Sequence, residues 1–282
     1  MEFIFYDNGK DFVSENLDLL TEKEWLNNLI VGNCEEAVNN VYGDDWLFGA
    51  IKNNGTTELI ILYRAPWKLT LYSPTNNTSD ELYKFAAEEV YKLNNHLPGV
   101  NTENVIGNKF SKYYCELSHQ TYKVHIPMRI LVLEKLAKPQ LRDDVTYRRA
   151  TIDDMPILKK FNVEFYSEAL GEEKTENEVE ENILKNLEKG YYLLEKDGKI
   201  VAQTVSTRKL KKGKGVSGVY TPKDERQKGY AYNLVYRVSK EFLDNGAEYC
   251  VLYTDDSNPI SNHVYEKIGY ERKADTSDID FI

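Results

Sequence analysis

The sequence contains few of the side chains that build metal centres and disulfide frameworks. It has three cysteines and four histidines among 282 residues, and neither set shows the close spacing of a zinc site or a redox pair. We therefore interpret Cys34, Cys115 and Cys250 as buried small hydrophobic residues, and we predict no metal site. The histidines also have no evident nucleophile partner, which argues against a hydrolytic triad.

Long apolar runs and a surplus of positive charge are also missing. No run approaches the roughly 18 apolar residues of a membrane-spanning helix, and the N-terminus lacks the basic-then-apolar order of a signal peptide. We therefore expect a cytoplasmic protein without a membrane partner. With 46 acidic against 36 basic residues, the net charge of -10 argues against nucleic-acid binding. The same charge favours cationic substrates, although acidity can also serve solubility alone.

A polar segment divides the chain into two parts. At 282 residues the chain exceeds the roughly 100–200 residues of one domain, so two domains are expected. Residues 134–144 are polar and include Pro139, and they separate an apolar run from a new strand at residues 146–148. We therefore predict an N-terminal domain of residues 1–140 and a C-terminal domain of residues 145–282.

The C-terminal half alternates between helical and strand-like patterns. An Asp-Gly pair at 197–198 supplies the positive backbone torsions of a hairpin turn. One expected helix starts at residues 151–154, and three others cover residues 176–189, 232–243 and 259–268. The expected strands cover residues 146–148, 191–195, 199–208, 216–221 and 249–254, and the tail after Tyr270 is expected to be extended. Residues 213–218 match the dinucleotide-binding glycine pattern, but no helix follows them, so we interpret residues 209–215 as a basic hairpin turn.

The N-terminal half repeats this order faintly. Its expected strands cover residues 46–51, 58–63, 68–72 and 124–133, and its expected helices cover residues 79–93 and 105–117. Both halves therefore read as mixed α+β units, which indicates a tandem duplication. Two unrelated small domains are the alternative.

The most informative stretch of the sequence joins a strand to a helix at residues 226–231. It combines the basic residues Arg226 and Lys228 with Gly229, which lets the backbone approach a ligand, and the small Ala231 in the first turn of the helix. A helix N-terminus offers unpaired amide donors and about half a positive charge. With two mobile cations beside it, this turn predicts a pyrophosphate site rather than a site for a single carboxylate.

This run resembles the pyrophosphate-binding motif of the GNAT superfamily of N-acetyltransferases, Gln/Arg-x-x-Gly-x-Gly/Ala after a strand. Residues 258–270 are similar to the next motif of the same superfamily, Asn-Pro-x-Ser-Asn-x-x-Tyr-x-Lys-x-Gly-Tyr, in the right order and at the right distance. The N-terminal half has no second copy of the first motif. The resemblance therefore implies tandem GNAT-like acyl-CoA N-acyltransferase folds, with a complete C-terminal fold and a degenerate N-terminal one that shapes the acceptor pocket.

The resemblance also implies a donor site for acetyl-CoA, the cosubstrate. Two parallel strands, residues 216–221 and 249–254, would splay apart and hold the pantetheine arm between them, while the amides of residues 227–231 take the pyrophosphate. Ser261 and Asn262 would either reach the same arm or cap the next helix, and we favour capping. The implied donor-site residues are Val219, Tyr220, Thr221, Arg226, Gln227, Lys228, Gly229, Tyr230, Ala231, Thr254, Asn258, Ser261, Asn262 and Tyr265.

The chemistry that follows is direct attack of an amine on the thioester. Tyr265 matches the superfamily's tyrosine near the sulfur, so we assign it as the acid that protonates the leaving thiolate. The Val219 amide is the candidate oxyanion donor. The base is either Asp255 or a water held by backbone carbonyls, because residues 216–221 carry no carboxylate or histidine.

The predicted function is N-acetyl transfer from acetyl-CoA to a primary amine of a small molecule or an amino-acid-like acceptor. The alternatives are a non-catalytic acyl-CoA sensor and a scaffold whose first half binds a protein partner. The residues that choose the acceptor are expected in the first helices of the C-terminal half, including residues 164–173. A monomer and a homodimer are both compatible with the sequence.

Overall fold

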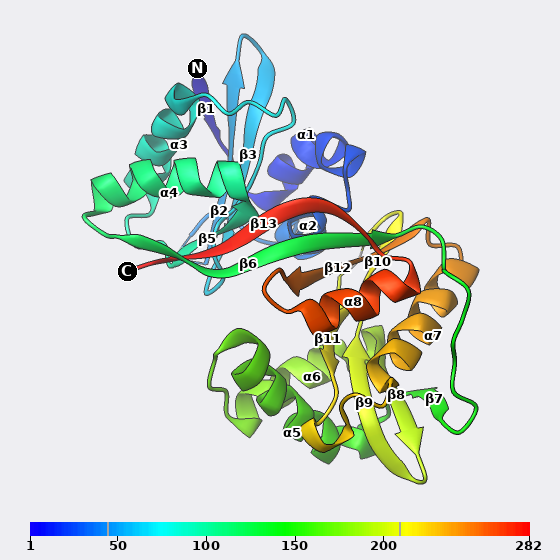
Figure 1. The fold of residues 1–282 in the computed structure, drawn as a ribbon. Helices are drawn as coiled ribbons and strands as arrows, with labels where there is room; N and C mark the ends of the chain where they lie inside the picture. Colours follow the sequence, from blue (N-terminus) through cyan, green and yellow to red (C-terminus); the bar gives the residue numbers. More distant parts are fainter. Residues whose placement is uncertain (44, 209) are drawn as a thin grey trace.

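A computed structural model describes residues 1–43, 45–208 and 210–282. These residues form a mixed α+β fold with three β-sheets, two of which belong to one half each while the third is shared (Figure 1). The predicted fold class of two GNAT-like units in tandem is confirmed. Within the described residues, no helix is long and apolar enough to cross a membrane.

The N-terminal half contains six strands and four helices among its described residues. In chain order they are β1 (Glu2–Phe5), α1 (Gly9–Glu22), α2 (Asn28–Ala37), β2 (Trp46–Asn53), β3 (Thr56–Arg64), β4 (Thr70–Tyr72), α3 (Asp80–Leu93), β5 (Gly99–Glu103), α4 (Asn104–Ser118) and β6 (Tyr122–Leu133). The predicted hairpin, β4, α3, α4 and β6 are confirmed. The sequence analysis missed β1, α1, α2 and β5. The buried face of α1 has helical spacing at Phe12, Asn16 and Leu20, but the polar Asn16 interrupts its apolar pattern. Strand β5 has a single large apolar residue, Val100, and so no apolar alternation.

Strand β2 has large apolar side chains on both faces of the first sheet, so helices must cover both faces. The sheet order is β1-β2-β3-β4. Alternate side chains of a strand point to opposite faces. Leu47 and Ile51 of β2 pack with α3 and α4, whereas Trp46 and Phe48 pack with α1 and α2. Both faces are therefore covered by hydrophobic cores.

The C-terminal half follows the predicted order closely. Its elements are β7 (Thr146–Arg149), the 3-10 helix η1 (Ile152–Asp154), α5 (Met155–Phe165), the π-helix η2 (Tyr166–Leu170), α6 (Glu176–Gly190), β8 (Tyr191–Lys196), β9 (Lys199–Val205), β10 (Gly213–Gly215), β11 (Ser217–Tyr220), the 3-10 helix η3 (Lys223–Glu225), α7 (Tyr230–Asp244), β12 (Tyr249–Asp255), α8 (Pro259–Ile268) and β13 (Glu271–Phe281). Asp197 and Gly198 have φ of 49° and 76°, as expected for the turn between β8 and β9.

The prediction for residues 209–215 is wrong. The proposed basic turn over residues 209–215 contains a short strand, β10, which pairs in parallel with β12; Lys209 itself lies outside the described residues. The glycines serve packing here, because a Cβ on Gly213 would lie 2.3 Å from the ring of Tyr249. The absent side chain lets the aromatic ring lie directly against the strand.

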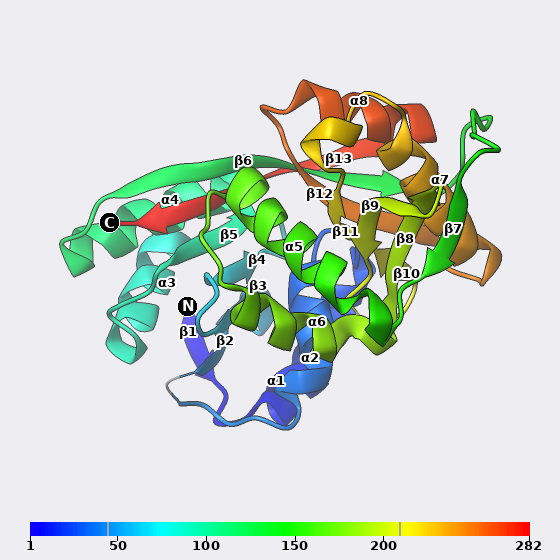
Figure 2. The same ribbon diagram turned by 90° about the horizontal axis from the view of Figure 1, so that it is seen from below.

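The third sheet joins the two halves by exchanging their last strands. Its order is β10-β12-β6-β13-β5, so β6 of the first half lies between β12 and β13 of the second, and β13 lies between β6 and β5. Figures 1 and 2 show β6 and β13 side by side along the boundary between the halves. Each half is therefore completed by a strand of the other, and the division at residues 140–145 stays a prediction.

Candidate active site

Two parallel strands separate where the resemblance implied. Strand β10 pairs with β12 up to Gly215 opposite Val251, and the Val216 amide still donates to the Val251 carbonyl at 2.9 Å. Beyond this point the chain enters β11, which pairs with β9, whereas β12 continues along β6. No described ladder pair joins β11 to β12, so a gap opens between the two strands.

A bulge in β11 decides which side chains face which side of this gap. Ser217 lies opposite Val205 and Tyr220 lies opposite Gln203, so three steps on β11 match two steps on β9. Gly218, with φ of 55°, absorbs the extra residue. Ser217 and Tyr220 therefore point to the same face, toward α5.

Val219 and Thr221 lie at the end of the strand that borders the gap. Val219 packs on the core beneath α7 and α8, so it faces away from α5. Thr221 follows β11, and its buried hydroxyl has no hydrogen-bond partner among the described residues. Backbone amides and an unused hydroxyl at the end of a splayed strand are suited to an extended polar ligand.

The turn before α7 presents its amides without a competing cap. Gln227 and Gly229 have φ of 63° and 79°. Gly229 is the N-cap of α7, where no side chain caps the helix and no acidic residue occupies the first turn. Residues 227–229 are exposed, whereas Tyr230 is buried beneath the helix. The free N–H groups and the positive end of the helix dipole therefore face solvent, as an anion site needs.

The two predicted cations of this turn are already paired. Arg226 Nη2 lies 2.6 Å from Glu168 Oε2, and Arg226 Nε donates to the Thr221 carbonyl at 3.0 Å. Lys228 Nζ lies 2.8 Å from Glu225 Oε2. They are therefore held by carboxylates rather than mobile, and the amides supply the unpaired positive potential of the turn.

Tyr265 lies on α8 with its ring in the core and its hydroxyl without a hydrogen-bond partner among the described residues. The residue is 8% exposed, and its ring meets that of Tyr270 edge-on at 6.0 Å. Burial raises the pKa of Tyr265 to about 12, so the phenol is neutral at physiological pH. A neutral, unpartnered phenol retains its proton for donation.

The start of α8 corrects one sequence interpretation. Asn258, and neither Ser261 nor Asn262, is the N-cap: its Oδ1 accepts from the Ser261 amide at 3.2 Å. The reason is Pro259, which prefers the first helical position and so places the cap one residue before it. The Asn262 side chain turns back and donates to the Asp255 carbonyl at 3.1 Å.

The candidate base Asp255 is engaged in the turn after β12. Its Oδ1 accepts from the Ser257 amide at 2.8 Å and from the Ser257 hydroxyl at 2.7 Å. Nearby, the Thr254 hydroxyl lies 3.4 Å from that of Ser261. The Asp255 carboxylate therefore has a structural partner, and its role as a base stays a prediction.

A cavity of about 400 Å³ lies on the α5 side of the gap and has an acidic wall. The Tyr220 hydroxyl lies 2.9 Å from Glu164 Oε2 and 3.0 Å from Glu168 Oε1. Burial and these two carboxylates raise the pKa of Tyr220. The cavity is lined by Lys160, Val163, Glu164, Ser167, Glu168, Glu173, Tyr220, Pro222, Lys223 and Asp224.

The sequence analysis placed acceptor selection in residues 164–173 but did not single out Glu164 or Glu168. Their four-residue spacing at the end of a helix was the available signal. It became specific only when the fold brought Tyr220 against both carboxylates. Glu164 and Glu168 face the gap from the side opposite to α7 and α8.

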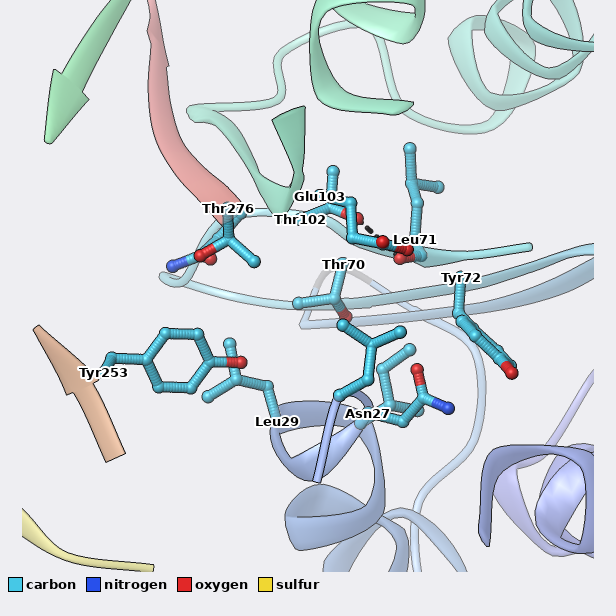
Figure 3. A pocket seen from close by; sticks show the side chains of 12 residues that line it. Asn27, Leu29, Thr70, Leu71, Tyr72, Thr102, Glu103, Tyr253 and Thr276 are labelled. Carbon is cyan, nitrogen blue, oxygen red and sulfur yellow. Dashed lines mark hydrogen bonds between the residues drawn. The ribbon is translucent and has the colours of Figure 1, made fainter. Parts of the chain in front are cut away.

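The N-terminal half has a corresponding gap, but it is nearly closed. Leu69, just before β4, forms a parallel bridge with Val100 of β5 before the strands diverge. The Thr102 hydroxyl then donates to the Leu71 carbonyl at 2.6 Å and bridges the gap. The remaining cavity is about 20 Å³, and Figure 3 shows Tyr253 and Thr276 facing it from strands of the other half. This space suits a water molecule, not a pantetheine arm.

The helix beside this closed gap is also unsuited to phosphate. The Ser79 side chain caps α3 by accepting from the Leu82 amide at 3.4 Å. Asp80 and Glu81 add negative charge to its first turn. They stabilise the helix but repel an anion. Among its described residues, the first half therefore has no equivalent of the open gap and uncapped helix of the second.

Comparisons with known proteins agree with this geometry. Residues 155–270 match the Acetyltransferase (GNAT) family. No curated protein sequence matches the chain. Among solved structures, a GNAT-family acetyltransferase from Colwellia psychrerythraea is 14% identical with a TM-score of 0.62 and covers 100% of both chains. A Drosophila protein is 12% identical with a TM-score of 0.67, covering 100% of this chain and 99% of its own.

A tandem GNAT protein from the clavulanic acid biosynthesis pathway is 11% identical with a TM-score of 0.60, and the match covers 100% of this chain and 98% of that one. At such identities the likeness concerns the fold alone. The family match covers most of the second half. The full-length structural likeness shows that the two halves have the same folds and arrangement as in these solved structures. The C-terminal half of the chain thus matches the acetyltransferase (GNAT) family over residues 155–270, and the whole chain has the fold of a tandem GNAT protein.

Proposed function

We propose that the protein transfers an acetyl group from acetyl-CoA to a primary amine of a small molecule or an amino-acid-like acceptor. The observation that carries this proposal is the uncapped N-terminus of α7 beside the gap between β11 and β12. The first suits a pyrophosphate, and the second suits a pantetheine arm. The family match supports acyl transfer in general.

The donor would bind mainly through backbone groups. The amides of residues 227–231 would hold the pyrophosphate, and β11 would pair with the pantetheine arm as a strand pairs with an extended peptide. Asn258 caps α8, so only its amide nitrogen is left for the arm. One acetyl-CoA is expected per chain, because in the described part of the first half the gap is bridged by Thr102 and helix α3 is capped by Ser79.

The reaction would proceed by direct attack of the neutral amine on the thioester carbonyl. The carbonyl oxygen would become an oxyanion stabilised by the Val219 amide, and the carbon–sulfur bond would then break. Tyr265 would give its proton to the leaving thiolate. The proton lost by the amine would pass to water held by backbone carbonyls or to Asp255. The acidic wall would attract the protonated amine mainly through Glu164, because Glu168 is already paired with Arg226.

A second candidate function is a non-catalytic acyl-CoA sensor. The bonding of the Asp255 carboxylate to Ser257 favours it, because Oδ1 is already engaged in two hydrogen bonds within the turn. This reading predicts tight CoA binding without turnover. Cytoplasmic location and a monomeric or homodimeric state stay predictions from the sequence.

Turnover distinguishes the two functions. Release of free CoA thiol would be followed with acetyl-CoA and a panel of amino acids, polyamines and aminoglycosides. Calorimetry would measure CoA binding separately. Tyr265→Phe should lower kcat about 100-fold or more with CoA binding retained, while Tyr122→Phe, an exposed tyrosine on β6, should behave as wild type. Binding without turnover of any amine would favour the sensor.

A further inference from the structure

An arginine for which the described residues provide no carboxylate partner lies at the apex of the gap, where its two strands begin to diverge. Arg208 follows β9, and its Nη2 donates to the Ser217 hydroxyl at 3.0 Å. Its guanidinium carbon lies 5.6 Å from the centroid of the Tyr253 ring. Ser217 is the first residue of β11, and Tyr253 lies two residues beyond Val251, where the pairing of β10 and β12 ends. The guanidinium thus lies between the two strands as they begin to diverge.

Two glycines make room for this side chain. A Cβ on Gly32 of α2 would lie 3.2 Å from Arg208 Cγ, and a Cβ on Gly215 of β10 would lie 2.8 Å from Arg208 Nε. Both distances are shorter than ordinary contacts between side chains. The site therefore uses elements of both halves and is shaped around the arginine.

Arg208 is half-buried, and among the described residues its charge has no anionic partner. Its Nε is buried without a hydrogen-bond partner, and within the described part of the chain the Ser217 hydroxyl is its one hydrogen-bond acceptor. Burial lowers the pKa of Arg208, with Tyr253 as the nearby ionisable group. A guanidinium nevertheless stays charged in proteins. Burying it without an anion destabilises the fold, which points to a functional reason for keeping it.

Arg208 lies on the same side of β11 as the acidic wall formed by Glu164 and Glu168. Because of the bulge at Gly218, Ser217 and Tyr220 point to the same side of β11. Three residues of strand span about 10 Å. A cationic group therefore marks the apex end of this face, and the carboxylates around Tyr220 mark its far end.

We propose that Arg208 binds a carboxylate of the reacting molecules, carried either by the acceptor amine or by the acyl chain of the donor. This inference rests on the proposed function. The planar guanidinium offers two parallel N–H donors that match a carboxylate. The acceptor class is then an amine that also bears a carboxylate; in the other case the donor is the CoA thioester of a dicarboxylic acid.

Two substrate pairs separate these sources. With acetyl-CoA, each amino acid of the panel would be compared with its amide, which keeps the amine and removes the negative charge. With one amine that lacks a carboxylate, succinyl-CoA would be compared with acetyl-CoA. We expect the carboxylate-bearing member of one pair to have a kcat/KM about 10- to 100-fold higher.

Arg208→Gln should abolish this preference while CoA affinity, measured by calorimetry, is unchanged. Arg208→Lys should restore only part of it, because an ammonium cannot form the bidentate contact. Arg272→Gln is the matched control, because Arg272 is exposed and pairs with Asp275. Circular dichroism would verify folding, and removal of a buried unpaired charge should leave the thermal midpoint equal or higher.

The outcomes for this inference and for the proposed function differ. Turnover with no carboxylate preference in either pair, or a preference that survives in Arg208→Gln, would overturn the role of Arg208 and leave the acetyltransferase function standing. Absence of turnover would overturn the function. In that case the affinities of succinyl-CoA and acetyl-CoA test the inference. Succinyl-CoA should bind more tightly than acetyl-CoA to the wild type but not to Arg208→Gln. Equal affinities of the two thioesters for the wild type would overturn the role of Arg208 too.

Discussion

The Tyr249 hydroxyl donates a hydrogen bond of 2.7 Å to Glu24 Oε2 and so ties the first half of the chain to the strand that forms one side of the gap. Glu24 is 2% exposed. Its carboxylate also accepts from the amides of Lys211, Lys212 and Gly213 at 2.6, 2.9 and 3.1 Å. One buried carboxylate thus satisfies three backbone donors at the edge of β10.

Removal of this carboxylate should destabilise the whole chain. Glu24→Ala leaves three backbone amides and a tyrosine hydroxyl without their acceptor, so we expect the free energy of unfolding to fall by about 3–5 kcal/mol. Urea denaturation would measure it. Glu22→Ala, at the C-terminus of α1, is the nearby control. A loss below 1 kcal/mol in Glu24→Ala would mean that water replaces the carboxylate without cost.

The turn before α7 should depend on Gly229 through its backbone. A Cβ there would meet only Asn233 Nδ2 at 3.9 Å, so space is available, but φ of 79° is unfavourable for alanine. Gly229→Ala should therefore misalign the amides and weaken CoA binding about tenfold. Gly246→Ala, with φ of 91° and no atom within 4 Å, carries the same strain away from the site. Equal CoA affinity in both variants would count against the phosphate site.

The acidic wall should select cationic acceptors. Glu164→Gln removes a charge 2.9 Å from the Tyr220 hydroxyl, so we expect the KM of diamines to rise about three- to tenfold and the KM of neutral amines to stay unchanged. Glu180→Gln is the control, because Glu180 pairs with Lys159 on α5. A uniform rise for all acceptors would instead indicate a distorted cavity.

The pH dependence of turnover follows from the buried phenol. Because burial raises the pKa of Tyr265 to about 12, the acid keeps its proton through the whole range below that value. We therefore expect kcat of the wild type to show no loss assignable to Tyr265 between pH 7 and about pH 10. An alkaline loss near pH 9 that disappears in Tyr265→Phe would contradict the assignment.

The start of α5 should make stability depend on acidic pH. Arg148 Nη1 and Nη2 each donate to Asp154 at 2.8 Å, as does the Thr151 amide. Hydrogen bonds from Arg148, and secondarily from Thr151, outweigh burial and lower the pKa of Asp154. A lowered folded-state pKa stabilises the fold above the unfolded value of about 3.9, and this contribution is lost as pH falls below it.

Asp154→Asn should therefore reduce the free energy of unfolding by about 1.5–3 kcal/mol at pH 7. The difference from the wild type should shrink steadily as the pH falls from about 4 toward 2. Asp153→Asn, which is exposed, should differ little from the wild type at either pH. Urea unfolding at pH 7 and pH 3 measures both; a constant difference would show that the charge of Asp154 is not involved.

Local chemistry in the sequence determined a large part of this protein. The Asp197-Gly198 turn and the Ser79 cap depend only on residues close to them in the sequence, as does the turn before α7. Helices, strands and the position of this turn could therefore be predicted before the fold was known. The same reasoning failed for β10, where the glycines matched a turn. Only the contact with Tyr249, which lies 36 residues after Gly213 in the numbering, shows why a strand passes there.

The tertiary structure alone decided how the halves combine and what faces the gap. The exchange of β6 and β13 depends on pairing between strands more than a hundred residues apart, and no periodicity encodes a partner. The carboxylate of Glu24 and the guanidinium of Arg208 look like ordinary surface residues in the sequence. Their burial follows from the packing of α2 and its neighbouring loop against β10 and β12. The sequence therefore determined the kind of site, and long-range packing determined which charges it contains.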